Sequence, residues 1–214
     1  VIGSGMTAAG LETWIADEGP GIPAEEKEIR YQQILSRYRE EDRNEFGKML
    51  GLLMLAVESQ RSSGRYVDIL GTVFHDLRLH NKWAGQFFTP GNVCDMMAEM
   101  AWGDSFSNII REKGQITVSE PACGSGAMVL SFATTMARRG YDPGESLLAD
   151  MWDIDARCIH MAYVQMSLYG VPAVLHVGDT LRMESWETWY TPGSLPFVVE
   201  KAEGDGESLV RSAS

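Results

Sequence analysis

The sequence lacks any long hydrophobic run. No window of its 214 residues approaches the ~18 uninterrupted apolar residues of a membrane-spanning helix. It also does not open with a basic segment followed by an apolar stretch, which is the pattern of a secretory signal. Hydrophobic residues make up 44% of the chain and charged residues 22%, close to the average of globular proteins. We therefore expect a folded, cytoplasmic protein with no membrane partner.

Cysteine and histidine are scarce. The three cysteines, Cys94, Cys123 and Cys158, lie far apart and form no Cys-x-x-Cys pair. This spacing favours neither a disulfide framework nor a zinc site, so we expect three reduced thiols. The four histidines are too scattered for metal-ligand spacing, and we predict no metal site.

Positive charge is also in short supply. Lys and Arg number 18 against 30 Asp and Glu, which gives a formal net charge of -12. Affinity for nucleic acid comes largely from the counterions that basic side chains release from phosphates. We therefore expect DNA binding to be possible but weak for this chain alone, although the basic residues between Arg30 and Lys82 could gather on one face.

The first part of the chain carries a helical pattern. Residues 1–5 precede Met6 and are interpreted as a cloning remnant outside the fold. We assign residues 6–82 to an N-terminal helical region, in which three apolar stripes predict three helices packed as a bundle. The predicted breaks between them are residues 40–44 and 62–64. The stripes are Tyr31, Ile34, Leu35 and Tyr38; Phe46, Met49, Leu50, Leu53 and Val57; and Ile69, Leu70, Val73, Phe74 and Leu77.

Strands and helices alternate from residue 83 to residue 200, which is typical of a parallel α/β sheet. We expect strands at residues 116–120, 147–152, 173–177 and 197–199, and helices at 124–139 and 155–169, the second closed by Gly170. Thr89 and Pro90 read as the N-cap and first residue of an earlier helix. Its buried face would carry Val93, Met96, Met97, Met100 and Ala101. Residues 201–214 are rich in Gly, Ser and Glu and are expected to be disordered.

The sharpest local signal is a glycine-rich turn between a predicted strand and a predicted helix, Glu-Pro-Ala-Cys-Gly-Ser-Gly at residues 120–126. Glycines let the backbone approach a ligand closely, and the following helix N-terminus offers free amides. The turn has neither the Gly-x-Gly-x-x-Gly pattern of dinucleotide sites nor the Lys and Ser/Thr of a P-loop, so a triphosphate is not expected. Asp153 and Asp179 end the next two strands, where nucleotide-binding folds place carboxylates. These residues predict a nucleotide-type site at the carboxyl edge of the sheet.

Four motifs, in this order and spacing, resemble the S-adenosylmethionine-binding half of adenine-N6 DNA methyltransferases. The closest likeness is to the methylation subunits of type I restriction systems. The motifs are Gly-Gln-Phe-Phe-Thr-Pro at 85–90, the turn at 120–126, Asp-Ile-Asp at 153–155 and Gly-Asp-Thr-Leu at 178–181. The resemblance runs from about Asp68 to Leu181. It implies a shortened, Rossmann-like methyltransferase sheet of the α/β class behind an N-terminal helical bundle, with S-adenosylmethionine as cofactor and DNA adenine as substrate.

The resemblance also implies which residues bind the cofactor. Phe87 and Phe88 would help to wall the methionine moiety and its sulfonium, because aromatic faces attract cations. Asp153 would bind the ribose and Asp179 the adenine amino group, while Cys123 would be a small wall residue and not a nucleophile. Glu120 replaces the aspartate more usual in the family. The full set is Phe87, Phe88, Thr89, Pro90, Glu120, Pro121, Ala122, Cys123, Gly124, Gly126, Asp153, Ile154, Asp179 and Thr180.

One family motif does not occur in the sequence. These enzymes hold the flipped target adenine with an Asn/Asp-Pro-Pro-Tyr/Phe loop after the fourth strand. The 214 residues contain no two adjacent prolines. Trp186, Trp189 and Tyr190 are weak candidates for stacking on the target base instead, although such a cluster is more often core or interface.

Several functions therefore stay open. The aromatic cluster could replace the loop, a partner chain could supply it, or the domain could bind cofactor without turnover. In the last case it would be a non-catalytic S-adenosylmethionine-binding or scaffold protein of a restriction, phage or mobile-element system. A further alternative is a methyltransferase for a different amine, such as an RNA base or a protein side chain. A protein partner or a homo-oligomer is compatible with each of these.

Overall fold

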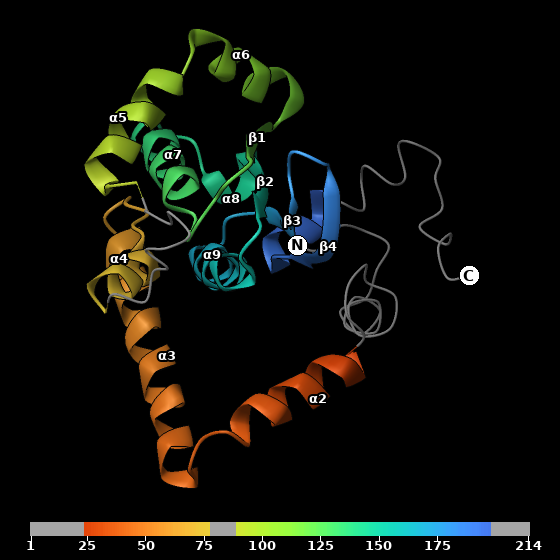
Figure 1. Ribbon diagram of the computed structural model, residues 1–214. Helices are drawn as coiled ribbons and strands as arrows, with labels where there is room; N and C mark the ends of the chain where they lie inside the picture. The colour runs from red at the N-terminus through yellow and green to blue at the C-terminus, as the bar shows by residue number, and fades with distance from the viewer. Residues whose placement is uncertain (1–23, 78–88, 198–214) are drawn as a thin grey trace. The chain divides into compact units, whose positions relative to one another are not determined.

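The computed structural model describes residues 24–77 and 89–197 (Figure 1). The chain divides into two compact units, Val1–Leu52 and Leu53–Ser214. This division falls earlier in the chain than residue 83, where the sequence pattern changes. Residues 1–5 and 201–214, for which we predict a cloning remnant and a disordered tail, lie outside the described residues. No helix in the described part of the chain is both long and apolar enough to cross a membrane.

The first unit contains helix α2 (Ala24–Leu35) and the larger part of helix α3 (Glu40–Arg61). Both helices form where apolar stripes predict them, but the predicted break at residues 40–44 is wrong. Glu40, Glu41 and Asp42 form the first turn of α3, because acidic side chains stabilise the positive end of a helix dipole. The chain turns at residues 36–39 instead. The packing of these helices into a bundle stays a prediction.

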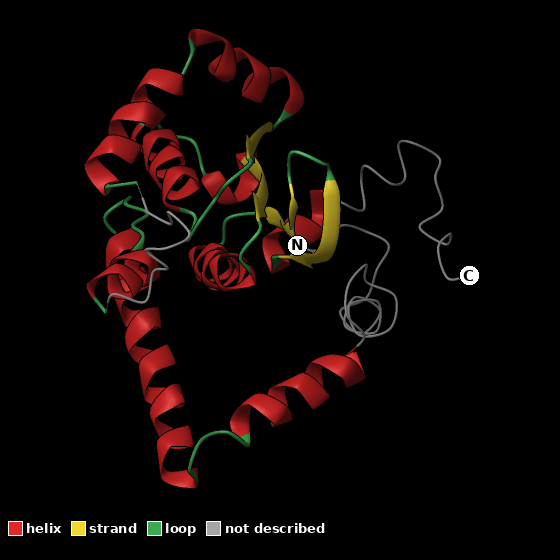
Figure 2. Cartoon of the chain, viewed as in Figure 1, coloured by secondary structure: helices red, strands yellow, loops and turns green. Residues whose placement is uncertain are grey.

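The second unit is built around a four-stranded sheet of order β1-β2-β3-β4 (Figure 2). Strands β1 (Ile116–Glu120), β2 (Leu147–Asp153) and β3 (Ala173–Asp179) are parallel and confirm the three predicted strands. Strand β4 (Glu184–Tyr190) is antiparallel to β3 and occupies the Trp-rich stretch. The strand predicted at 197–199 is wrong at its first residue, since residues 195–197 are helical after the turn η2 (Pro192–Ser194). Residues 198–199 lie outside the description.

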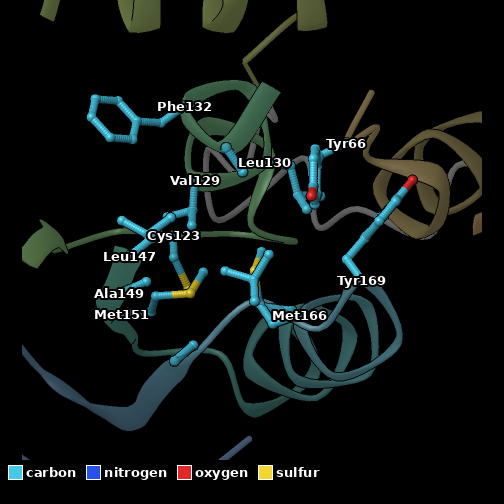
Figure 3. Close-up of a cluster of buried hydrophobic side chains, with 14 of the residues drawn as sticks. Tyr66, Cys123, Val129, Leu130, Phe132, Leu147, Ala149, Met151, Met166 and Tyr169 are labelled. Carbon is cyan, nitrogen blue, oxygen red and sulfur yellow. The ribbon is translucent and has the colours of Figure 1, made fainter. Parts of the chain in front are cut away.

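Two helices cover one face of the sheet. Helix α7 (Ala127–Arg138), followed by the short α8 (Pro143–Ser146), connects β1 to β2, and α9 (Ala156–Tyr169) connects β2 to β3 (Figure 1). Each of these two connections leads to the next strand in the order β1-β2-β3. Because such connections are right-handed, both helices lie on the same face of the sheet. Alternate strand residues such as Met151 and Leu175 are fully buried against them. Figure 3 shows the sulfur-bearing side chains of Cys123, Met151 and Met166 gathered in this layer.

Helix α9 begins and ends as the sequence predicts. The Asp155 side chain accepts a hydrogen bond from the Arg157 amide at the N-cap, and Gly170 adopts φ 72° at the C-cap. Helix α4 (Ile69–Asp76) and the end of α3 also belong to the second unit. Val57 of α3 is buried there. The predicted turn at residues 62–64 is confirmed between them.

Helix α5 (Gly91–Ala101) departs from two predictions. Pro90, not Thr89, is its N-cap residue, and no side chain caps it. The predicted apolar face is largely exposed, with Met96, Met97 and Met100 in solvent, while the buried positions are Cys94 and Ala98. Small residues let α5 approach α7 closely. The Ser131 hydroxyl of α7 then donates a 2.8 Å hydrogen bond to the Asp95 carboxylate, and Thr135 donates one of 3.1 Å to Glu99.

Helix α6 (Asp104–Lys113) is not predicted from the sequence. Its polar residues outnumber its apolar ones, so its local pattern resembles a loop. Ile110 is nevertheless buried, and the Phe106 ring lies 5.6 Å from Trp102 and 5.9 Å from Phe132 of α7. Contacts with residues distant in sequence therefore stabilise this helix.

Candidate functional site

The glycine-rich turn lies between β1 and α7. Gly124 and Gly126 have φ of 55° and 95°, in the left-handed region that favours glycine. The Gly126 amide closes the turn by donating a 2.8 Å hydrogen bond to the Cys123 carbonyl. A Cβ at Gly126 would lie 2.6 Å from the Met166 Cε, so no larger residue fits without movement. The turn is therefore packed directly on α9.

Asp153, at the end of β2, holds this turn. Its Oδ2 accepts a 2.9 Å hydrogen bond from the Gly124 amide, and its Oδ1 accepts one of 2.8 Å from the Asp155 amide. An ionised carboxylate can accept about four hydrogen bonds, so capacity remains on both oxygens. The side chain is only partly buried. Asp153 is thus fixed in position and still able to accept hydrogen bonds from a ligand.

The end of β3 reaches the same turn. The Thr180 hydroxyl donates a 2.7 Å hydrogen bond to the Pro121 carbonyl. The Asp179 Oδ1 accepts hydrogen bonds from the amides of Leu181 at 3.0 Å and Arg182 at 3.2 Å. The carboxyl ends of β1, β2 and β3 therefore converge, with the predicted residues Glu120, Pro121, Gly124, Asp153, Asp179 and Thr180 at one edge.

The charges at this edge favour a ligand with hydroxyl groups or positive charge. Glu120, Asp153 and Asp179 end the three strands, and the Glu120 Oε1 accepts a 3.3 Å hydrogen bond from the Ala122 amide. One cation, the Arg182 guanidinium, lies 3.5 Å from the Asp179 carboxylate. Carboxylates repel phosphate and accept from hydroxyl and ammonium donors. These charges disfavour a phosphate-rich ligand at this edge.

Both nearby thiols are held neutral. Burial, reinforced by the neighbouring Asp153, raises the pKa of Cys123 well above its ordinary value. Burial, with Asp68 and Asp95 adding to it, raises the pKa of Cys94 to about 11. Because the thiolate is the reactive form, neither side chain is an activated nucleophile. All three cysteines are buried, and none of them forms a disulfide.

Two large apolar side chains beside the site face solvent. Ile154 is 67% exposed directly after Asp153, and Leu181 is 98% exposed after β3. Pro121 and Ala122 are exposed on the turn as well. Ile154 belongs to the predicted set, whereas Leu181 is missed as a site residue although it ends the Gly-Asp-Thr-Leu motif. Exposed apolar side chains next to fixed carboxylates suit a ligand with a flat ring and a polar sugar.

The other predicted residues belong to segments outside the three strand ends. Phe87 and Phe88 lie outside the described residues, and Thr89 and Pro90 are exposed at the start of α5. Trp189 and Tyr190 pair with Leu175 and Val174, toward the opposite end of β3 from Asp179.

Trp186 and Trp189 have different surroundings. The Trp189 ring lies 5.3 Å from the His160 ring and 5.2 Å from the Tyr163 ring, both of α9. Trp186 is exposed near the carboxyl edge. Trp189 is therefore packed against α9, whereas Trp186 is mostly exposed.

The residues within 24–77 and 89–197 contain no group of three His, Cys, Asp or Glu side chains arranged to hold a metal ion. Parallel strand ends that carry a glycine turn and two aspartates are an arrangement typical of nucleotide-binding α/β proteins. The family model described as N-6 DNA Methylase matches residues 68–200, and the chain belongs to this family. Searches of curated proteins and of solved structures found no match. Family membership confirms the resemblance on which the predicted site rests.

Proposed function

We propose that this chain binds S-adenosylmethionine at the carboxyl edge of β1–β3 and is the cofactor-binding part of an adenine-N6 DNA methyltransferase. One observation carries the proposal: the 2.9 Å hydrogen bond from the Gly124 amide to Asp153, which joins the glycine turn to the strand-end carboxylate. Family membership supplies the reaction class. The acidic edge supports a cofactor with a sulfonium and an ammonium group rather than a phosphate-bearing one.

Each part of the cofactor has a chemically suitable group here. The remaining acceptor capacity of Asp153 suits the two ribose hydroxyls, in charge-assisted hydrogen bonds. The exposed Ile154 offers an apolar surface to the adenine ring, and Asp179 an acceptor for its amino group. Glu120 and the backbone of the turn suit the ammonium and carboxylate of the methionine part.

The bound cofactor would supply an activated methyl group for in-line transfer to an amine nitrogen. The residues of this chain bind and orient that cofactor, which is the positioning that a displacement at carbon requires. Residues that hold the target adenine are proposed to come from a partner chain. Two observations support this: the 214 residues hold no adjacent prolines, and Trp189 packs on α9.

A second candidate function is a non-catalytic S-adenosylmethionine-binding or scaffold protein. The lack of an Asn/Asp-Pro-Pro-aromatic sequence within the 214 residues favours it. The two functions agree on cofactor binding and differ on methyl transfer. A binding measurement therefore tests what they share.

Replacing Asp153 by alanine should weaken S-adenosylmethionine binding, because charge-assisted hydrogen bonds contribute ~1.5–3 kcal/mol each. We expect the dissociation constant measured by calorimetry to rise by more than about tenfold. Asp150→Asn is the matched control, since Asp150 lies on the same strand but bonds to His176 and Trp152. Equal affinity of the Asp153→Ala variant and the unaltered chain would show that the ribose is held elsewhere.

A further inference from the structure

A partly buried hydrogen-bond network joins the start of helix α4 to the glycine turn. The Asp68 Oδ1 accepts a 2.8 Å hydrogen bond from the Gly71 amide and so caps α4. Its Oδ2 accepts a 2.5 Å hydrogen bond from the hydroxyl of Ser125. Ser125 stands between Gly124 and Gly126 and is almost fully buried. The residue that caps α4 therefore also holds the middle of the turn.

Gln165 of α9 completes this network. Its Nε2 donates to the Asp68 Oδ1 at 2.9 Å and to the Ser125 carbonyl at 2.8 Å. Its Oε1 accepts from the amides of Ile69 at 2.8 Å and Leu70 at 3.0 Å. The Gln165 side chain is fully buried and uses both donors and both acceptor positions. A fully satisfied buried network specifies one arrangement of the groups that it joins.

The close approach of α4 to the turn also explains Gly71. This residue is helical and has no positive φ, so its backbone conformation does not require glycine. A Cβ built on Gly71 would overlap the Asp68 carboxylate and the Ser125 hydroxyl. Glycine costs helix stability relative to alanine. Here it leaves the space that the Asp68–Ser125 hydrogen bond occupies.

We propose that Asp68, Ser125 and Gln165 are positioning residues, which hold the glycine turn in the conformation that binds cofactor. This inference rests on the proposed function. Two glycines make the turn conformationally free in isolation, and ordering it on binding would cost affinity. The network orders it beforehand, through Ser125, while Asp153 fixes Gly124 from the other side. Cofactor affinity therefore depends on the docking of α4, at Asp68, and on α9.

Ser125→Ala and Gln165→Met test this, with Tyr169→Phe as the matched control. The Tyr169 hydroxyl accepts from the Val67 amide and donates to the Val67 carbonyl, each at 3.0 Å. It thus joins α9 to the segment just before α4 without contacting the turn. We expect Ser125→Ala and Gln165→Met to raise the S-adenosylmethionine dissociation constant at least about tenfold. Tyr169→Phe should lower the melting temperature comparably and leave that constant within about twofold.

Hydrogen exchange in the cofactor-free protein is the second readout. Amides in residues 121–130 should exchange faster in Ser125→Ala and Gln165→Met than in Tyr169→Phe, because only the first two release the turn. If Ser125→Ala and Gln165→Met exchange at the turn no faster than Tyr169→Phe, the inference is overturned, even where the unaltered chain binds cofactor. Faster exchange at the turn in a protein that binds no S-adenosylmethionine upholds the positioning role and overturns the proposed function. Ser125→Ala removes one hydroxyl and keeps the test decisive if Gln165→Met does not fold.

Discussion

Asp150 and Asp153 lie three positions apart on β2 and have different surroundings, because successive strand residues point to opposite faces. Asp153 meets the glycine turn. Asp150 lies on the face opposite α7 and α9, where its Oδ1 is 3.2 Å from the His176 Nε2 and 3.1 Å from the Trp152 Nε1. The Trp152 and His176 rings stack with centroids 4.2 Å apart. The contacts with His176 and Trp152 therefore give Asp150 a structural role, whereas Asp153 belongs to the candidate site.

The Asp150 pair predicts a pH dependence of stability. The hydrogen bond with His176 holds the pKa of Asp150 below its ordinary value, despite partial burial. A carboxyl whose pKa is lower in the folded state stabilises the fold above its unfolded pKa, near 3.9, and loses that contribution as the pH falls through the folded value. Asp150→Asn should therefore lower the free energy of unfolding at pH 6 by less than about 1 kcal/mol, since the side chain is partly exposed.

Urea unfolding at a series of pH values measures this difference, which should shrink toward pH 3. In a His176→Gln background the Asp150→Asn change should have a smaller effect, because the partner is gone. A difference that is constant across the series would contradict the assignment.

Among the elements, β4 shows how tertiary packing decides the role of an aromatic cluster. Trp189 faces α9, whereas Trp186 precedes Glu187 where the pairing with β3 shifts register between Val177 and Gly178. Trp186 has no partner on β3 at this shift, whereas Trp189 pairs with Leu175. The tryptophans of this strand therefore differ in burial and in the effect that their loss should have.

Trp189→Ala should destabilise the protein by about 2–4 kcal/mol, because it removes a large side chain packed on His160 and Tyr163. Trp186→Ala, which changes a mostly exposed side chain, should stay within about 0.5 kcal/mol. Thermal or chemical unfolding followed by tryptophan fluorescence compares the two. Unchanged stability in Trp189→Ala would argue that this ring is available to a base.

At the scale of the whole molecule, net charge and family membership point in different directions. The family acts on DNA, but the chain carries a net charge of -12 and can release few counterions from a duplex. We therefore expect the cofactor-binding function to reside in this chain, and the grip on DNA and on the target base to require a partner.

The purified chain should bind S-adenosylmethionine and transfer methyl groups to DNA negligibly until a partner is added. The 214 residues contain no target-base loop motif, and such a loop supplies amine contacts, stacking and stabilisation of the flipped base, each of which contributes to rate. Calorimetry measures cofactor binding, and a radiolabelled assay measures methyl transfer to DNA. Duplex binding at physiological salt measures the affinity of the chain for DNA. Robust adenine methylation by the isolated chain, lost in Trp186→Ala or Trp189→Ala, would establish the β4 aromatics as a base-binding site.

The sequence by itself determined the features that depend on neighbouring residues. Alternating and helical periodicities locate β1, β2, β3, α7 and α9, and Gly170 locates the end of α9. The glycine turn followed by two strand-end aspartates predicts which residues meet at one edge, because parallel strands bring their carboxyl ends together. Such patterns are readable because each depends on only a few consecutive residues.

Only the tertiary structure decided the features that depend on distant residues. The buried face of α5 is Cys94 and Ala98 because α7 accepts small residues there, and no local rule ranks them above three methionines. Strand β4 forms at the edge of β3 and not at residue 197. Gln165 bonds to Asp68 across 97 positions of sequence. The free energy of such contacts arises only when the chain has closed those distances, so no sequence window contains it.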